Sequence, residues 1–158
     1  MELNLPDEAA TVRLGAALAD SLPDLRGASL LLALQGDLGT GKTTLARGLL
    51  RALGVEGAIR SPTFTLVEPY ETRAGTIHHL DLYRLQGAQA ELDAIGYRDY
   101  RGMPGLVIVE WPERGAAALG VADLSITIEH QALGRRLCIE AATDAGQAWQ
   151  GALRYERI

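Results

Sequence analysis

The segment with the most specific chemistry is the glycine-rich run Gly36-Asp-Leu-Gly-Thr-Gly-Lys42-Thr43. It fits the phosphate-binding pattern G-x-x-x-x-G-K-[ST], which requires a strand before it and a helix after it. Glycines let backbone N–H groups wrap around phosphate oxygens, and the helix N-terminus adds partial positive charge. We therefore expect Lys42 to reach the β- and γ-phosphates of a nucleotide, and Thr43 to place its hydroxyl on Mg²⁺. An ordinary glycine-rich turn is the alternative.

Two acidic residues at the ends of apolar runs are candidates for a magnesium phosphate site. Glu110 follows Leu106-Val-Ile-Val, which should lie beside the strand before the loop, and Asp81 follows Thr76-Ile-His-His-Leu80. Such a site needs a carboxylate near Thr43, bound to the ion or to one of its waters. We expect Glu110 to serve the metal and Asp81 to hold the nucleophilic water or a metal-bound water. These roles are exchangeable on sequence alone, and solvated strand ends are the alternative for both.

Three further features of the sequence bear on this site. Ser61-Pro62-Thr63-Phe64 is a hydroxyl-rich loop stiffened by proline, which suits a γ-phosphate sensor and equally suits a plain turn. Trp111 follows Glu110 and either packs on the phosphate loop or faces a partner. His78 and His79 should point to opposite faces of a strand, so we expect neither joint metal binding nor catalysis from them.

The apolar pattern of the segments around these residues predicts alternating strands and helices. Ser29–Gln35 is apolar on both faces, which is typical of a central strand, and the apolar spacing over 42–53 predicts a helix that Gly54 ends. The other predicted elements are a strand over 3–5, a helix after Pro6 and Asp7, a hairpin of 65–71 and 76–81, a weak helix over 88–95 followed by Gly96 and a polar loop, a strand over 106–110, a short helix from Pro112 to Leu119, a hairpin of 123–129 and 135–142, and a last helix after Thr143 and Asp144.

This order of elements favours the α/β class. We expect a P-loop NTPase fold in which a mixed, mostly parallel central sheet is flanked by helices and extended by antiparallel hairpins. The sequence shows no internal repeat and no Pro-, Gly- and Ser-rich linker, so we interpret residues 1–158 as a single domain.

The composition excludes several classes of protein. The chain has 158 residues, 47% apolar, with a net charge of -5, which suits one globular core and makes independent nucleic-acid binding unfavourable. A single cysteine, Cys138, excludes an intramolecular disulfide or a zinc knuckle and suits a reducing cytoplasm. The N-terminus lacks the pattern of a secretory signal, and the longest apolar stretch, 28–34, is far shorter than the roughly 20 residues of a membrane span. We expect a cytoplasmic protein with no membrane contact.

The base of the nucleotide is suggested by elimination. Lys42 is the only lysine, so the guanine-reading pattern N-K-x-D cannot occur elsewhere in the sequence. ATP is therefore favoured.

Four segments taken together closely resemble the bacterial TsaE family, also called YjeE. They are GDLGTGKTT at 36–44, SPTFTLVEPY at 61–70, HLDLYRL at 79–85 and VEWPER at 109–114. The resemblance implies the small ATPase of the machinery that makes N6-threonylcarbamoyladenosine (t6A) at position 37 of tRNA. It also implies that TsaD and TsaB are the partners, that they hold the tRNA and the catalytic centre, and that this chain meets tRNA only through them.

The resemblance also implies roles for individual residues. Lys42, Thr63 and Asp81 would be catalytic, with Thr63 and Asp81 in mobile switch-like segments, and Thr43 and Glu110 would ligate Mg²⁺. Arg135 and Arg136 either flank the base or simply begin a strand. The residues that would contact the nucleotide are Thr11, Gly36, Gly39, Thr40, Gly41, Lys42, Thr43, Thr44 and Trp111.

The leading hypothesis is an ATPase whose hydrolysis resets a tRNA-modifying complex and which is slow without its partners. A small-molecule kinase is a first alternative, although the scattered arginines do not form a recognisable lid over ATP. A nucleotide-gated binding module with little hydrolysis is a second.

Overall fold

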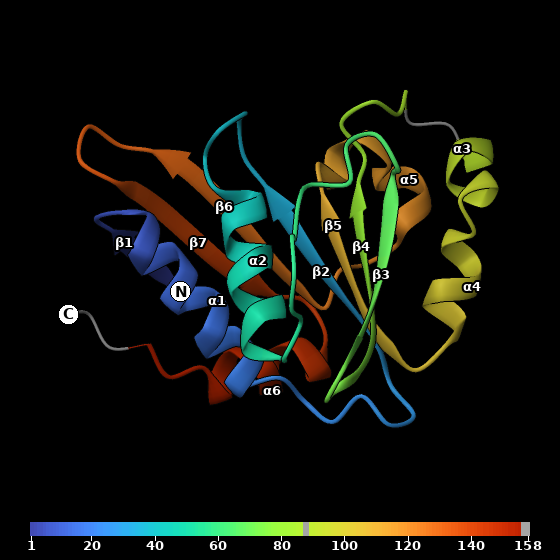
Figure 1. The fold of residues 1–158 in the computed structure, drawn as a ribbon, viewed down its shortest axis with the longest axis horizontal. Helices are drawn as coiled ribbons and strands as arrows, with labels where there is room; N and C mark the ends of the chain where they lie inside the picture. The colour runs from blue at the N-terminus through green and yellow to red at the C-terminus, as the bar shows by residue number, and fades with distance from the viewer. Residues whose placement is uncertain (87–88, 156–158) are drawn as a thin grey trace.

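One mixed sheet organises the fold, in the order β1-β7-β6-β2-β5-β4-β3 (Figure 1). The computed structural model describes residues 1–86 and 89–155. The central strands β6, β2, β5 and β4 run parallel, and the remaining strands join through antiparallel pairs. The predicted mixed sheet with antiparallel additions is therefore confirmed. The strands are β1 (Glu2–Leu5), β2 (Ser29–Gln35), β3 (Val67–Thr72), β4 (Gly75–Asp81), β5 (Gly105–Glu110), β6 (Leu124–His130) and β7 (Arg135–Ala141).

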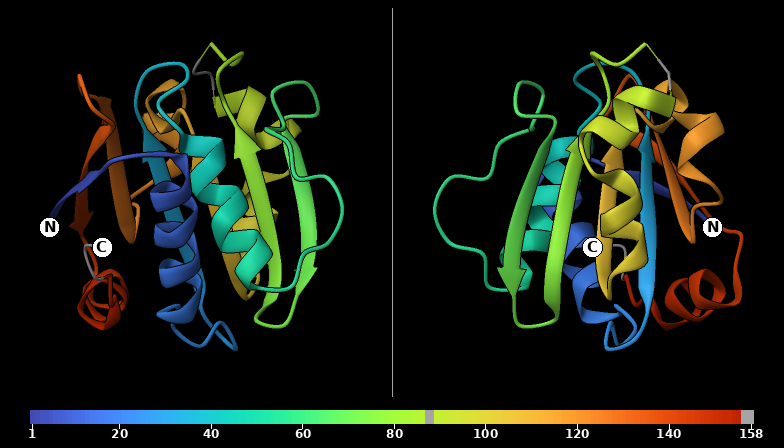
Figure 2. Two further views of the ribbon diagram at one scale, coloured as in Figure 1. Left: turned by 60° about the vertical axis from the view of Figure 1, so that its left-hand side comes forward. Right: turned by 90° about the vertical axis from the view of Figure 1, so that its right-hand side faces the viewer.

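Helices cover both faces of this sheet, with α1 and α2 on one side and α3 and α4 on the other (Figure 2). Side chains alternate along β2, so Leu30 and Leu32 pack with the α1 side whereas Leu31 packs with the α3 side. This double burial explains why the β2 sequence is apolar throughout. The helices are α1 (Glu8–Asp20), α2 (Lys42–Ala52), α3 (Gln89–Ala94), α4 (Tyr97–Gly102), the 3-10 turn η1 (Pro112–Arg114), α5 (Ala116–Leu119) and α6 (Asp144–Ala152).

Two helical segments differ from the sequence prediction. The residues after Gly96, predicted as a polar loop, form α4, because Tyr97 buries its ring and donates its hydroxyl to the carbonyl oxygen of Leu119 at 2.6 Å. The predicted helix over 112–119 is divided into η1 and α5 at Gly115, where a Cβ would lie 2.9 Å from Leu82 Cδ1. Ala88, the predicted start of another helix, lies outside the described residues.

No helix within residues 1–86 and 89–155 has the length and apolar character that crossing a bilayer requires.

Helices α1 and α2 pack closely because each presents a glycine to the other. A Cβ on Gly15 would lie 2.7 Å from the backbone nitrogen of Leu49, and a Cβ on Gly48 would lie 2.5 Å from the carbonyl oxygen of Val12. Real Cβ atoms do not approach backbone this closely, so any larger residue forces the helices apart. Since α2 begins directly after the glycine-rich loop, this contact fixes the position of the loop relative to the sheet.

We expect Gly48→Ala to lower the free energy of unfolding by about 1–3 kcal/mol, because the added methyl overpacks the contact with α1. Gly151→Ala is the matched control, since Gly151 lies in α6 and a Cβ there meets no atom within 4 Å. Alanine should be neutral or stabilise by up to about 1 kcal/mol at that helical position. Urea unfolding of the two variants checks this, and equal stability of both would contradict the close-packing account.

Candidate active site

A cavity of about 290 Å³ lies at the carboxyl ends of β2, β4 and β5, where the loops that follow these parallel strands meet. Parallel sheets place their ligand sites at this edge. Nine of the predicted site residues line the cavity, together with Leu38, Ser61 and Tyr83. The nine are Gly39, Gly41, Lys42, Thr43, Thr44, Thr63, Asp81, Glu110 and Trp111.

The predicted order of a strand, a glycine-rich loop and a helix is confirmed. Gly36 has a φ of 138°, and a Cβ there would clash with the carbonyl oxygen of Ile128. Gly41 has a φ of 108° and precedes α2, whose first turn is closed by the Leu45 N–H donating to the Gly41 carbonyl at 2.9 Å. Both positions require glycine because L side chains rarely adopt such angles. The loop therefore ends with the N-terminus of α2 facing the cavity.

Lys42 is folded back onto the loop that precedes it. Its Nζ donates to the carbonyl oxygens of Gly36 at 2.5 Å and Asp37 at 2.9 Å, and lies 3.9 Å from the centre of the Trp111 ring. Burial lowers the pKa of Lys42, and the surrounding acids, Glu110 foremost, oppose that shift. Two carbonyl oxygens and one aromatic face thus define the position of the ammonium group.

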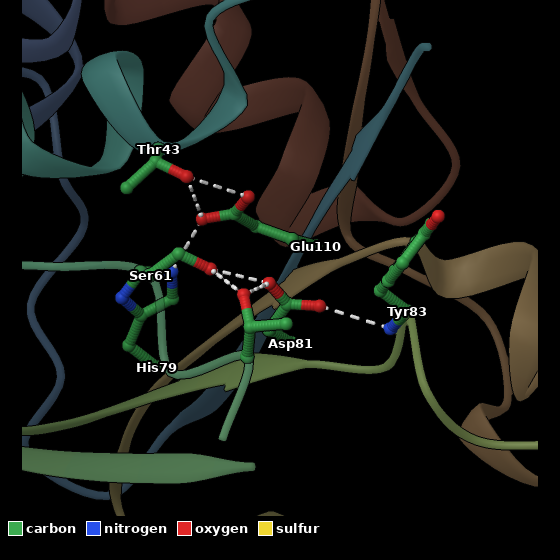
Figure 3. A network of polar contacts seen from close by, with 7 residues as sticks. Thr43, Ser61, His79, Asp81, Tyr83 and Glu110 are labelled. Carbon is green, nitrogen blue, oxygen red and sulfur yellow. Dashed lines mark hydrogen bonds and ion pairs between the residues drawn. The ribbon is translucent and has the colours of Figure 1, made fainter. Parts of the chain in front are cut away.

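Thr43 and Glu110 meet across the junction of α2 and β5. The Thr43 hydroxyl lies 2.9 Å from each carboxylate oxygen of Glu110, which is almost fully buried (Figure 3). This arrangement follows from the register, since Glu110 lies beside Leu34 on the strand that leads into the loop. In the described part of the chain, no three His, Cys, Asp or Glu side chains form a group that could hold a metal ion. Mg²⁺ commonly takes one carboxylate together with phosphates and waters, so a hydroxyl and a carboxylate at one point fit that ion.

Asp81 forms a separate hydrogen-bonded group beside Glu110, its partner in the β4–β5 register (Figure 3). Its Oδ2 accepts hydrogen bonds from Ser61 and, at 2.9 Å, from Thr63, and its Oδ1 accepts the Tyr83 backbone N–H at 2.9 Å. The segment between α2 and β3 bows away from the sheet (Figure 2), and these bonds tie its end to β4. Glu110, and not Asp81, makes the contact with Thr43.

Three predicted contact residues do not line the cavity and instead support the loop. The Thr40 hydroxyl donates to the Asp37 carbonyl at 2.9 Å, and Gly36 presents its carbonyl to Lys42. Thr11 is fully buried in α1, where its hydroxyl accepts from Arg135 Nη1 at 3.0 Å.

The two neighbouring arginines of β7 lie in different surroundings. Arg135 Nη1 would be 2.5 Å from a Cβ on Gly41, so this guanidinium packs against the glycine loop. Arg136 instead pairs with Glu2 at 2.7 Å on the neighbouring strand β1. Of the two, only Arg135 contacts the loop.

Trp111 adopts a left-handed backbone conformation with a φ of 58°. A non-glycine residue pays about 1–2 kcal/mol for this conformation, so its surroundings must hold it there. Its backbone N–H donates to the Leu34 carbonyl at 3.2 Å, and its ring centre lies 4.9 Å from that of Tyr83. The ring is thereby directed against Lys42 at the cavity wall.

Besides Leu38 and Tyr83 in the cavity wall, sequence reasoning missed His79, which lies next to the site. The ring is fully buried, and its Nε2 lies 2.8 Å from Glu110 Oε1. The prediction that His78 and His79 point to opposite faces of the strand is confirmed, since His78 stacks on Tyr100. The missed signal was the two-residue spacing of His79 and Asp81, which puts both on one face of β4.

Several known proteins are similar to this chain over most of its length. The family model described as "Threonylcarbamoyl adenosine biosynthesis protein TsaE" matches residues 5–137. A Haemophilus influenzae protein named tRNA threonylcarbamoyladenosine biosynthesis protein TsaE is 39% identical over 144 residues, covering 90% of each chain. A Synechocystis protein of the same name is 47% identical over 116 residues, 72% of this chain and 71% of that one. The crystal structure of Bacillus subtilis YdiB shares the fold, with a TM-score of 0.77 over 97% of this chain and 93% of that chain at 24% identity.

We expect Asp81→Ala to lower the free energy of unfolding by about 1–3 kcal/mol, because Ser61, Thr63 and the Tyr83 N–H lose their common acceptor. The loss should be local, so backbone amides near Ser61 and Thr63 should exchange with deuterium faster than in the wild type. Asp99→Ala, a change at an exposed position on α4, is the control. Unchanged exchange in the loop would show that Asp81 does not anchor it.

Proposed function

Because this chain belongs to the TsaE family, we propose that it is a P-loop ATPase that binds and hydrolyses Mg²⁺·ATP in tRNA threonylcarbamoyladenosine biosynthesis. The observation that carries this proposal is the convergence of Lys42, Thr43, Asp81 and Glu110 on one cavity beside the N-terminus of α2. That combination supplies backbone donors, one cation, a hydroxyl and two carboxylates, which are the groups that phosphoryl transfer uses.

We assign phosphate binding to the glycine loop and to Lys42. Phosphate oxygens would replace the carbonyls of Gly36 and Asp37 as acceptors for the ammonium, which exchanges two neutral partners for charged ones. Trp111, whose ring lies against the Lys42 ammonium, would close one wall of the cavity. The side chains of Thr40, Thr11 and Arg135 would support the loop from behind, and would act on the nucleotide through the shape of the loop.

We assign Thr43 and Glu110 to the metal and Asp81 to the attacking water. Bound Mg²⁺ would supply neutralising charge to the phosphates. Glu110 suits the metal because it meets the Thr43 hydroxyl, whereas Asp81 has no such contact and lies with the hydroxyls of Ser61 and Thr63. A carboxylate flanked by hydroxyls can accept a hydrogen bond from water and orient it toward a phosphate. Thr63 would change position together with the loop over 61–64 when the nucleotide binds.

The charge balance of the cavity supports a dependence on partners. Among the described residues that line it, Lys42 is the only basic side chain, and it faces the carboxylates of Asp81 and Glu110. Phosphoryl-transfer enzymes gain much of their rate from further positive charge at the transition state, frequently an arginine. We therefore propose that hydrolysis is slow in the isolated protein and drives the cycle of a TsaD–TsaB complex. That complex, in the cytoplasm, would hold the tRNA, since the chain carries a net charge of -5.

We expect Lys42→Arg to fold normally but to weaken ATP binding by about 10- to 100-fold, as the loss of one charge-assisted hydrogen bond to phosphate implies. The planar guanidinium is too wide for the space that the ammonium occupies between the Gly36 and Asp37 carbonyls and the Trp111 ring. Isothermal titration with ATP measures the affinity. Arg47→Lys, the converse exchange on the same helix, should bind ATP as the wild type does. Wild-type affinity and turnover in Lys42→Arg would contradict the assigned role of the lysine.

Reconstitution with TsaD and TsaB tests the proposed activity. ATP turnover should rise on adding the partners, and tRNA modification should require this chain and fail with Asp81→Ala. Rapid hydrolysis alone with no partner effect would contradict the proposal. Persistent modification with Asp81→Ala would favour the nucleotide-gated binding module, and phosphate transfer to a metabolite in preference to water would favour the kinase.

A further inference from the structure

His79 has a burial and a bonding pattern that packing alone does not explain. The imidazole is fully buried in β4, and its Nε2 lies 2.8 Å from Glu110 Oε1. In the part of the chain that the structure describes, the buried Nδ1 has no hydrogen-bond partner. A buried polar atom left unpaired costs about 1–3 kcal/mol, so an apolar side chain would serve the core better at this position. The contact with Glu110 is therefore the feature that a histidine adds.

The direction of this hydrogen bond follows from the chemistry of the partners. An ionised carboxylate can only accept, so the hydrogen lies on Nε2 and His79 is the donor. Glu110 then has donors on two sides, the ring of His79 from within the sheet and the Thr43 hydroxyl from the cavity. These contacts fix the carboxylate plane, and without His79 its Oε1 would be buried with one donor fewer.

We propose that His79 is a positioning residue that holds the Glu110 carboxylate in the orientation in which it meets Thr43 and takes part in Mg²⁺ binding. This inference rests on the metal role proposed above for Thr43 and Glu110. Groups that hydrogen-bond a metal-ligating carboxylate commonly change metal affinity by 10- to 100-fold when they are removed. His79 acts on the ion only through Glu110, because its Nε2 is engaged by the carboxylate and its Nδ1 is buried within the sheet.

Two amide substitutions separate donor position from ring packing. Glutamine can place an N–H where Nε2 lies, whereas asparagine is one methylene shorter and places its N–H near the position of Nδ1. We therefore expect His79→Gln to keep the bond to Glu110 and His79→Asn to lose it. His79→Leu removes the donor while keeping an apolar group in the sheet. His78→Gln is the control, because the neighbouring ring stacks on Tyr100 at 4.1 Å on the other face of β4.

The experiment measures the affinity of each full-length variant for a fluorescent ATP analogue, first in EDTA and then along a Mg²⁺ titration. In EDTA all variants should bind as the wild type does. His79→Asn and His79→Leu should need about 10- to 100-fold more Mg²⁺ for the half-maximal effect. His79→Gln and His78→Gln should stay close to the wild-type requirement. Thermal unfolding of each variant confirms that it is folded.

Several outcomes would overturn the proposal. A wild-type Mg²⁺ requirement in His79→Asn would show that the hydrogen bond donated to Glu110 is not needed for Mg²⁺ binding. Equal losses in His79→Gln and His79→Asn would assign the effect to the shape of the ring. If His79→Leu fails to fold, the two amide variants decide between these results. A wild type whose nucleotide binding ignores Mg²⁺ would overturn the proposed metal role itself, which distinguishes that failure from a failure confined to His79.

Discussion

The hydrogen bonds between the Thr43 hydroxyl and the Glu110 carboxylate join the first turn of α2 to the end of β5, and the geometry of the site depends on this junction. They form only because β5 lies beside β2 in a register that places Glu110 next to Leu34, at the point where the chain leaves the sheet for the glycine loop. The close approach of α1 to α2 at Gly15 and Gly48 holds the other side of the junction. A shift of either helix or strand would separate the hydroxyl from the carboxylate. The packing of the α1 side of the core therefore bears directly on the chemistry at the edge of the sheet.

Buried charge is concentrated where this junction faces the cavity. Lys42, Asp81 and Glu110 are each less than 5% exposed, and burying an ionised group without partners is costly. Asp123, also buried, shows what a purely structural acid looks like, since its carboxylate accepts the Leu31 N–H at 2.7 Å and the Thr143 hydroxyl at 2.6 Å. Those bonds join the residue before β6 to β2 and to the N-cap of α6, away from the cavity. Apart from the Tyr83 backbone N–H that binds Asp81, the acids of the cavity accept from side-chain hydroxyls and from a histidine, and these groups can change partners when a ligand enters.

The single lysine illustrates how a compact cation suits this site. The Lys42 ammonium fits between two loop carbonyls and the face of Trp111, an aromatic residue whose backbone is itself held in a left-handed conformation. Carbonyl oxygens and an aromatic face offer only partial negative charge, so a phosphate would be a stronger partner than those the lysine has. The loop thus presents its cation already desolvated at the wall of the cavity. Strain at Trp111 and burial of Lys42 are tolerated because neighbouring strands and helices fix both residues.

Features that depend on neighbours along the chain can be predicted from the amino-acid sequence. The spacing of glycines, Lys42 and Thr43 identified the phosphate loop, and apolar periodicity identified the strands and most of the helices, because both signals are local. Sequence reasoning did not find α4, since the burial of Tyr97 depends on Leu119, and it left Glu110 and Asp81 exchangeable, since only strand order decides which of them meets Thr43. It also could not show that Thr11 and Thr40 support the loop from outside the cavity. The partnership of His79 with Glu110 joins residues on different strands, and such pairings arise only when the sheet has assembled. These contacts depend on the folded chain, because strand register and helix packing set the distances between groups that lie far apart in the sequence.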